Sequence, residues 1–319
     1  MVQLDHMTNG RAIFGSGPGA LASDAYTLGL DPMTLRDRQD EAIGIIRKLL
    51  RGDERFNYDS DWFTLREAKL QLLPLQERLP FAVASMISPS GMTLAGKHGT
   101  GVLSIGSMSK AGLQALPTQW SFAEDAAKDY GNIVNRRDWR IVMFWHIAET
   151  RQQARQEAKD GLFRWRNEYT AGTLMQVGVE PFTDPDQGVD EMAFSDGASA
   201  VIGTPDDLIS KIRELIELTG GFGTVIGFVH DWANRENTNR SWDMVARYVI
   251  PEINGMLDAY RESRQFVIEN RESFDRARAA IMNKIMSNEK AAAALKQGGG
   301  TKSAYVPHPT PTSEKETSD

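Results

Sequence analysis

The stretch 79–105 constrains the fold of this chain more than any other segment. Residues 81–86 form an apolar run of the kind that predicts a strand buried on both faces. Ser88 and Pro89 follow directly and predict the start of a short helix, and residues 102–105 predict a second buried strand. Two buried strands joined by a helix form a βαβ unit, which indicates a parallel sheet covered by helices.

The turn between the first strand and the helix has the chemistry of an anion-binding site. Ser88 is a favourable N-cap, and Pro89 suits the first helical position, where its missing N–H costs nothing. Ser90 and Gly91 add little side-chain bulk, so the backbone N–H groups of the first turn stay accessible to a phosphate. The same residues can also serve only as a helix cap, so two interpretations remain open at this point.

Strand signals and helix signals alternate along the rest of the chain. We predict five buried strands, near Ala12, Phe81, Val102, Ile141 and Val225. This alternation predicts a parallel sheet, in which ligands bind at the carboxyl ends of the strands. The glycine-rich turn 15–17, the Ser88 turn and His230 all follow predicted strands, so all three belong to that edge.

Two segments lack a regular hydrophobic period. Residues 106–119 predict a loop that leads into a helix over 120–130. Residues 171–200 are rich in Gly, Asp and Pro and predict a long loop, of the kind that often forms a lid. Thr204 and Pro205 then mark the start of a further helix.

Composition excludes several classes of protein. The chain has 319 residues, a net charge of −7 and no cysteine, which argues against a general nucleic-acid or membrane-surface partner and excludes disulfides and thiolate catalysis. No segment approaches the roughly 20 apolar residues of a membrane span, and the first residues lack the pattern of a signal peptide. A cytoplasmic location is therefore expected.

Several motifs together resemble one family. They are LDHMTNGRAIFGSGPGA, AVASMISPSGMTLAGKHGTGVLS, WRIVMFWHIAET, IGTPDDLISKI and TGGFGTVIGFVHDWA. In this order the pattern resembles the bacterial luciferase-like flavin-dependent monooxygenases, in particular the limonene monooxygenase-like branch. The resemblance implies the fold class α/β with a (β/α)8 TIM barrel, of which this chain contains about five of the eight units.

The resemblance also implies an activity. It implies a monooxygenase that uses reduced FMN, supplied by a separate flavin reductase, and O2 to oxygenate a small organic substrate. By the same resemblance the phosphate lies at Ser88, Ser90 and Gly91, and Gly15, Gly17 and Ser85 lie near the flavin.

Two departures from the family pattern affect these expectations. The family barrel begins with about three βα units before the motif with which this chain starts, so we expect a truncated, fragmentary or split form. The strands near Ala12 and Val225 would then be edges, and we expect a homo-oligomer or a complementing N-terminal chain. Pro18 also stands where some relatives place a phosphate-binding arginine.

The expected organisation has three parts. Residues 1–262 form the barrel domain, residues 263–297 form a C-terminal helical extension, and residues 298–319 form a disordered tail. Within the barrel domain, His230 is the candidate catalytic residue because it follows the last predicted strand. His146 lies inside a strand pattern and is interpreted as structural.

Other functions remain open. None of the five histidines has metal-ligand spacing, so we predict no metal site. The first alternative is a non-catalytic flavin-binding or interaction protein derived from the same fold. The second is a deazaflavin-dependent oxidoreductase on that fold.

Overall fold

The computed structural model describes residues 1–19, 21–174 and 179–297. The chain divides into two compact units, residues 1–254 and residues 255–319, and each has its own organisation. The predicted disordered tail 298–319 lies outside the described residues. The predicted boundary between barrel and extension, at residue 262, stays a prediction.

A six-stranded parallel sheet forms the centre of the first unit. Its strands are β1 (Phe14–Ser16), β4 (Phe81–Ser85), β5 (Gly101–Ser104), β6 (Trp139–Ile147), β7 (Ala200–Gly203) and β8 (Thr224–Gly227). The order is β1-β4-β5-β6-β7, and β8 pairs with the first half of β6. The predicted α/β class is confirmed, with the sheet of a half-barrel. A separate antiparallel hairpin consists of β2 (Phe56–Asp59) and β3 (Thr64–Ala68).

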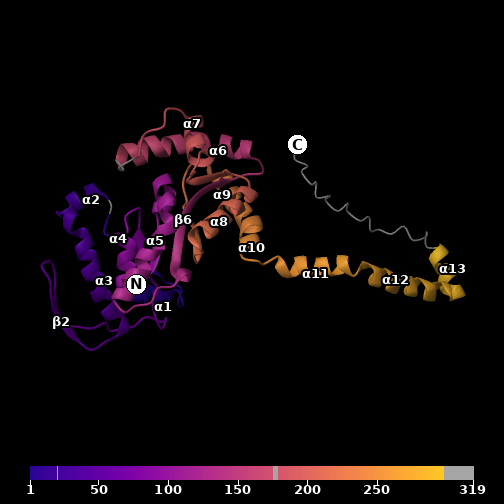
Figure 1. Ribbon diagram of the computed structural model, residues 1–319, viewed down its shortest axis with the longest axis horizontal. Helices are drawn as coiled ribbons and strands as arrows, with labels where there is room; N and C mark the ends of the chain where they lie inside the picture. Colours follow the sequence, from indigo (N-terminus) through magenta and orange to yellow (C-terminus); the bar gives the residue numbers. More distant parts are fainter. Residues whose placement is uncertain (20, 175–178, 298–319) are drawn as a thin grey trace. The chain divides into compact units, whose positions relative to one another are not determined.

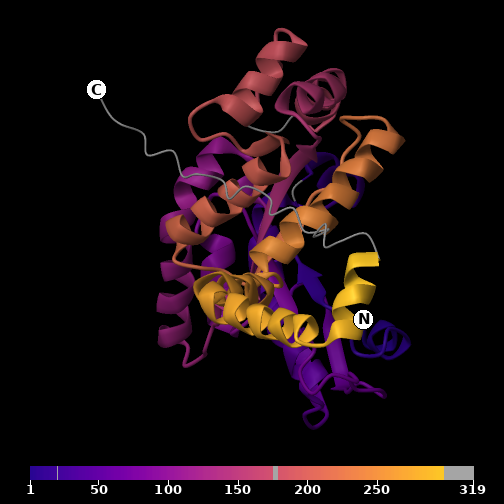
Figure 2. The same cartoon turned by 90° about the vertical axis from the view of Figure 1, so that its right-hand side faces the viewer.

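Helices connect these strands. In the first unit they are α1 (Val2–Met7), α2 (Ala22–Thr27), α3 (Leu35–Arg51), α4 (Ser90–His98), α5 (Lys110–Asp129), α6 (Arg151–Arg164), α7 (Pro185–Val189), α8 (Pro205–Thr219), α9 (Arg235–Met244) and α10 (Ile250–Ile253). Figure 1 shows α6 and α7 together at one end of this unit and the β2–β3 hairpin at the other, and Figure 2 shows the same separation.

Successive side chains along a strand point to opposite faces of the sheet, so the buried apolar residues form two separate clusters. On one face Val83, Val102 and Ile141 pack against α4, α5 and α8 in the larger cluster, in which Trp120 stacks on Trp139 at 5.1 Å. On the opposite face, Phe144 near the carboxyl end of β6 belongs to a second cluster with residues of α6, α7 and β7. The sheet is therefore covered by helices along one face, and its second cluster gathers at the carboxyl end.

Three sequence predictions were wrong in part. The strand β7 was missed because 171–200 was interpreted as a loop; residues 175–178 of that span lie outside the described residues, and the structured part also contains α7. The predicted loop 106–119 is largely helical, since α5 begins at Lys110 and contains Pro117. The first strand lies two residues later than predicted, so Gly15 is inside β1 rather than in the turn after it.

The predicted edges of the sheet agree with the pairing. Within the described residues, β1 pairs with β4 alone and β8 pairs with β6 alone. The strand β7 also pairs only with β6 there, which adds a third end to the sheet. Whether a second copy or another chain covers these strands stays a prediction.

The second unit contains three helices, α11 (Asp258–Glu269), α12 (Arg271–Met286) and α13 (Glu289–Gln297). None of their described residues is buried, and the rings of Phe266 and Phe274 meet edge to face at 6.1 Å. These helices extend over residues 258–297, and the predicted division into a barrel domain 1–262 and an extension 263–297 stays a prediction.

Candidate functional site

The candidate phosphate turn lies between β4 and α4. Ser85 is the last residue of β4, and α4 begins at Ser90 with Pro89 as its N-cap. The prediction that Ser88 caps the helix was wrong, because no side chain caps α4. The hydroxyl of Ser88 instead lies 2.8 Å from the hydroxyl of Ser90, and both residues are exposed. Two hydroxyl groups therefore stand together at the start of α4.

Gly91 brings α4 against the end of β4. A Cβ atom built on Gly91 would lie 2.6 Å from the carbonyl oxygen of Ala84 and 2.8 Å from the Cα of Ser85. Such distances leave no room for a side chain. Gly91 can thus offer its backbone N–H to a ligand, whereas a side chain placed there would press on β4.

The hydroxyl of Ser85 is the polar group of this turn that most needs a partner. Ser85 is 1 % exposed, and its Oγ atom has no hydrogen-bond partner among the described residues. A buried hydroxyl without a partner is costly unless a water or ligand satisfies it. Together with the helix start and the exposed Ser88–Ser90 pair, this donor set fits a phosphate group.

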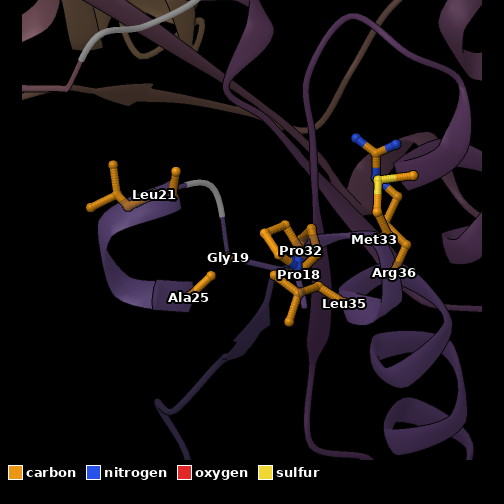
Figure 3. Close-up of a pocket in the computed structure, with 9 residues that line it drawn as sticks. Pro18, Gly19, Leu21, Ala25, Pro32, Met33, Leu35 and Arg36 are labelled. Carbon is orange, nitrogen blue, oxygen red and sulfur yellow. The ribbon is translucent and has the colours of Figure 1, made fainter. Parts of the chain in front are cut away.

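The segment after β1 approaches the same edge. A Cβ atom on Gly17 would lie 3.5 Å from the Cβ of Ala84, so this segment runs close to β4. The hydroxyl of Ser16 accepts a 3.1 Å hydrogen bond from the amide of Gln39 in α3. A pocket of about 320 Å³ follows, shown in Figure 3 and lined by Pro18, Gly19, Leu21, Ala22, Ala25, Pro32, Met33, Leu35 and Arg36. Gly17 thus stands between the sheet and this pocket, whereas Gly15 belongs to β1 itself.

His230 lies beyond β8 and contacts the carboxyl half of β6. Its Nε2 atom is 3.0 Å from the carbonyl oxygen of Trp145, to which it donates, and its Nδ1 atom accepts from the backbone N–H of Trp232 at 3.3 Å. Burial lowers the pKa of His230 to about 4. Two backbone groups therefore hold a neutral imidazole in one tautomer, and a catalytic role for this ring stays a prediction.

A buried ionic network surrounds His146, which the sequence indicated only as structural. His146 is 1 % exposed, and its Nε2 atom lies 2.9 Å from a carboxylate oxygen of Glu157 in α6. Arg240 of α9 and Gln153 donate to the other oxygen of Glu157. Burial lowers the pKa of His146. Burial alone would raise the pKa of Glu157, but the hydrogen bonds from His146, Gln153 and Arg240 hold that pKa below its usual value. The network ties α6 and α9 to β6.

Aromatic side chains form a wall beside His230. The Phe144 ring lies 5.2 Å from the rings of Trp165, Phe228 and Trp232, and His230 stacks on Trp232 at 3.8 Å. Phe228 is 42 % exposed, whereas Phe144 and Trp232 are buried. The sequence shows these aromatic residues but not that three segments, β6, the residues after α6 and the residues after β8, bring them together.

Two features are absent from the described residues. In the ranges 1–19, 21–174 and 179–297, no three His, Asp or Glu side chains are grouped so that they could hold a metal ion. None of the helices in those ranges is long and apolar enough to cross a membrane.

A known protein family matches most of the first unit. The model of the luciferase-like monooxygenases matches residues 1–221. The chain belongs to the luciferase-like monooxygenase family. This result confirms the predicted family and its enzyme class, the monooxygenases, which are oxidoreductases.

Two relatives are similar over most of the chain. The 4-hydroxyprotoasukamycin monooxygenase of Streptomyces nodosus subsp. asukaensis is 41% identical over 271 residues, which cover 84% of this chain and 72% of the relative. The limonene 1,2-monooxygenase of Rhodococcus erythropolis is 38% identical over 281 residues, which cover 88% and 71%. The predicted similarity to the limonene monooxygenase-like branch is therefore confirmed.

A solved structure shows the same fold. It is the oxygenating constituent of 3,6-diketocamphane monooxygenase from Pseudomonas putida, a type II Baeyer-Villiger monooxygenase in complex with FMN. Its TM-score is 0.61 at 24% identity, and the match covers 78% of this chain and 73% of that one. At this identity the likeness supports the fold alone.

Proposed function

We propose that this luciferase-like monooxygenase uses reduced FMN and O2 to oxygenate a small apolar organic molecule. The observation that supports this most is the β4–α4 turn. This turn contains the buried, unpartnered hydroxyl of Ser85, the paired exposed hydroxyls of Ser88 and Ser90 and the start of α4, all at the carboxyl edge of a parallel sheet. This is the donor set that a flavin phosphate requires.

Each part of the turn has a distinct task in this proposal. The first N–H groups of α4 and the hydroxyls of Ser88 and Ser90 bind the phosphate, and Gly91 allows α4 to start against β4. Gly15 and Gly17 keep the edge beside β4 free of side chains, which leaves room for a flat ring. Bound reduced FMN supplies two electrons, so that one oxygen atom enters the substrate and the other leaves as water.

The aromatic wall supports an apolar substrate. Phe228 follows β8 and is half-exposed beside the buried ring of Phe144, so it presents apolar surface at the same edge of the sheet. An apolar surface at a binding edge favours apolar ligands and excludes water. Limonene, named in one relative, is a suitable first probe because it is small and apolar.

The reduced cofactor needs a source, and we propose a separate flavin reductase as the partner. The test is a coupled assay of the full chain with a purified flavin reductase, NADH, FMN and limonene. We expect oxygenated limonene and O2 consumption that depends on this chain. Flavin binding with hydrogen peroxide as the sole product would instead favour the non-catalytic flavin-binding alternative.

A binding experiment tests the phosphate turn separately. FMN and riboflavin differ only in the phosphate, so a working phosphate turn makes FMN the tighter ligand. Titrations with oxidised flavins, and with reduced flavins under anaerobic conditions, measure both dissociation constants. Equal affinity for FMN and riboflavin would refute phosphate binding at this turn.

A further inference from the structure

A buried amide contacts the loop that carries the phosphate turn. Gln119 lies in α5 and is 4 % exposed. Its Nε2 atom donates a 3.0 Å hydrogen bond to the carbonyl oxygen of Ile87, and its Oε1 atom has no partner among the described residues. Burying a primary amide with only one hydrogen-bond partner costs free energy, so a polar residue at this position is unfavourable for stability alone.

The loop between β4 and α4 has few other restraints. The side chains of Met86 and Ile87 are exposed, as are Ser88 and Pro89. Across the part of the chain that the structure describes, the bond from Gln119 is the one hydrogen bond that reaches the backbone of residues 86–88. The position of the Ser88 hydroxyl therefore depends on a contact from a distant segment.

The helix that provides this contact is fixed. Gly96 of α4 lies directly against the carbonyl oxygen of Ala123 in α5, too close for any side chain, and Gly112 at the start of α5 lies as close to Gly106. Trp120, the neighbour of Gln119, is buried in the larger core cluster. Gln119 consequently projects from a well-packed helix onto a loop whose backbone is also packed against Gly106 at Met86 but has no other hydrogen bond over residues 86–88 within the described residues.

We propose that Gln119 is a positioning residue for the phosphate end of the flavin. It holds the Ile87 carbonyl so that the hydroxyls of Ser88 and Ser90 face the same ligand as the first N–H groups of α4. Gln119 does not touch the phosphate in this assignment; it acts through the loop. The inference rests on the proposed function, because it presupposes that the turn binds a phosphate.

A purely structural role makes a different prediction. If Gln119 only stabilised the fold, its replacement would lower the thermal stability and affect all flavins alike. If it positions the turn, its replacement weakens FMN but leaves riboflavin binding unchanged, because riboflavin lacks the phosphate. The ratio of the two dissociation constants therefore separates the two roles.

The experiment compares Gln119→Met with Gln114→Leu in the full chain. Methionine has nearly the length of glutamine but no donor, and Gln114 is an exposed residue of the same helix. We expect Gln119→Met to raise the FMN dissociation constant about tenfold, the equivalent of one lost hydrogen bond, with riboflavin within about twofold. Gln114→Leu should change neither constant.

A second variant removes the donor without burying a charge. Gln119→Leu takes the amide away from the Ile87 carbonyl and should also lower the preference for FMN; it decides the question if Gln119→Met does not fold. A folded variant with an unchanged FMN-to-riboflavin ratio, or one in which both flavins weaken equally, overturns the inference. A wild-type chain without preference for FMN refutes the proposed function instead, so the two failures are distinguishable.

Discussion

Ser90→Asp tests the phosphate turn through charge alone. Ser90 is exposed and is the first residue of α4, a helix with no acidic residue in its first turn. An aspartate at this position interacts favourably with the helix dipole and should stabilise the folded chain by about 0.3–1 kcal/mol. The same carboxylate would repel a phosphate bound at the turn. Stability and FMN affinity are thus expected to change in opposite directions.

The geometry sets the size of the effect. The hydroxyls of Ser88 and Ser90 are 2.8 Å apart, so one phosphate oxygen can contact both. A carboxylate in place of the Ser90 hydroxyl would then lie about 4 Å from the phosphate charge, which costs about 1 kcal/mol in water and about 4 kcal/mol at an effective dielectric constant of about 20. FMN affinity should therefore fall between about fivefold and about 700-fold.

Fluorescence titration with FMN and riboflavin at two salt concentrations measures this effect. Ser90→Asn is the matched control, because it adds a side chain of the same shape without the charge. The loss of FMN affinity should be smaller at high salt, and riboflavin affinity should not change. Unchanged FMN affinity in a folded Ser90→Asp variant would remove this turn as the phosphate site.

Further predictions concern stability and metal dependence. Gly91→Ala forces a side chain against β4 and should cost about 1–3 kcal/mol in urea unfolding, whereas Gly15→Ala, with open space around it, should cost less than about 1 kcal/mol. The lowered pKa of His230 means that the unfolded chain binds the proton more tightly, so stability falls as the pH drops from 7 to 5, by about 2 kcal/mol for this group. His230→Gln should flatten that part of the profile, and an unchanged slope would contradict it. EDTA should leave oxygenase activity intact, and a loss that one divalent ion restores would contradict this.

The βαβ unit at 79–105 could be predicted because each signal there is local. A buried strand needs only an apolar run, and a helix end needs only a residue such as Gly99, which adopts a left-handed conformation in the structure. The prediction that Ser88 and His230 lie at the carboxyl edge of the sheet followed from the parallel arrangement of the strands alone. These inferences needed no knowledge of which side chains touch.

The errors arose where distant contacts override local signals. Residues 200–203 carry no clear strand signal before the correctly predicted helix start at Thr204, yet β7 forms there because the second half of the long strand β6 is available to pair with it. Residues 106–119 lack a regular hydrophobic period, but α5 begins at Lys110 and continues through Pro117. The close approach of Gly91 to Ala84, like the contact of Gln119 with Ile87, depends on the packing of whole helices and leaves no pattern in the sequence.

The ionisable groups of the site agree with a protein that relies on a cofactor for its chemistry. His230 has both ring nitrogens bound to backbone groups, and His146 is paired with Glu157 in a buried network with Arg240. Burial lowers the pKa of both histidines and so favours their neutral forms. What the edge of the sheet offers instead is a donor set for an anion beside β4 and an aromatic wall beside β6 and β8. In the function we propose, those two features would bind and orient the flavin and the substrate and exclude water, which is the contribution expected of a protein whose cofactor performs the reaction.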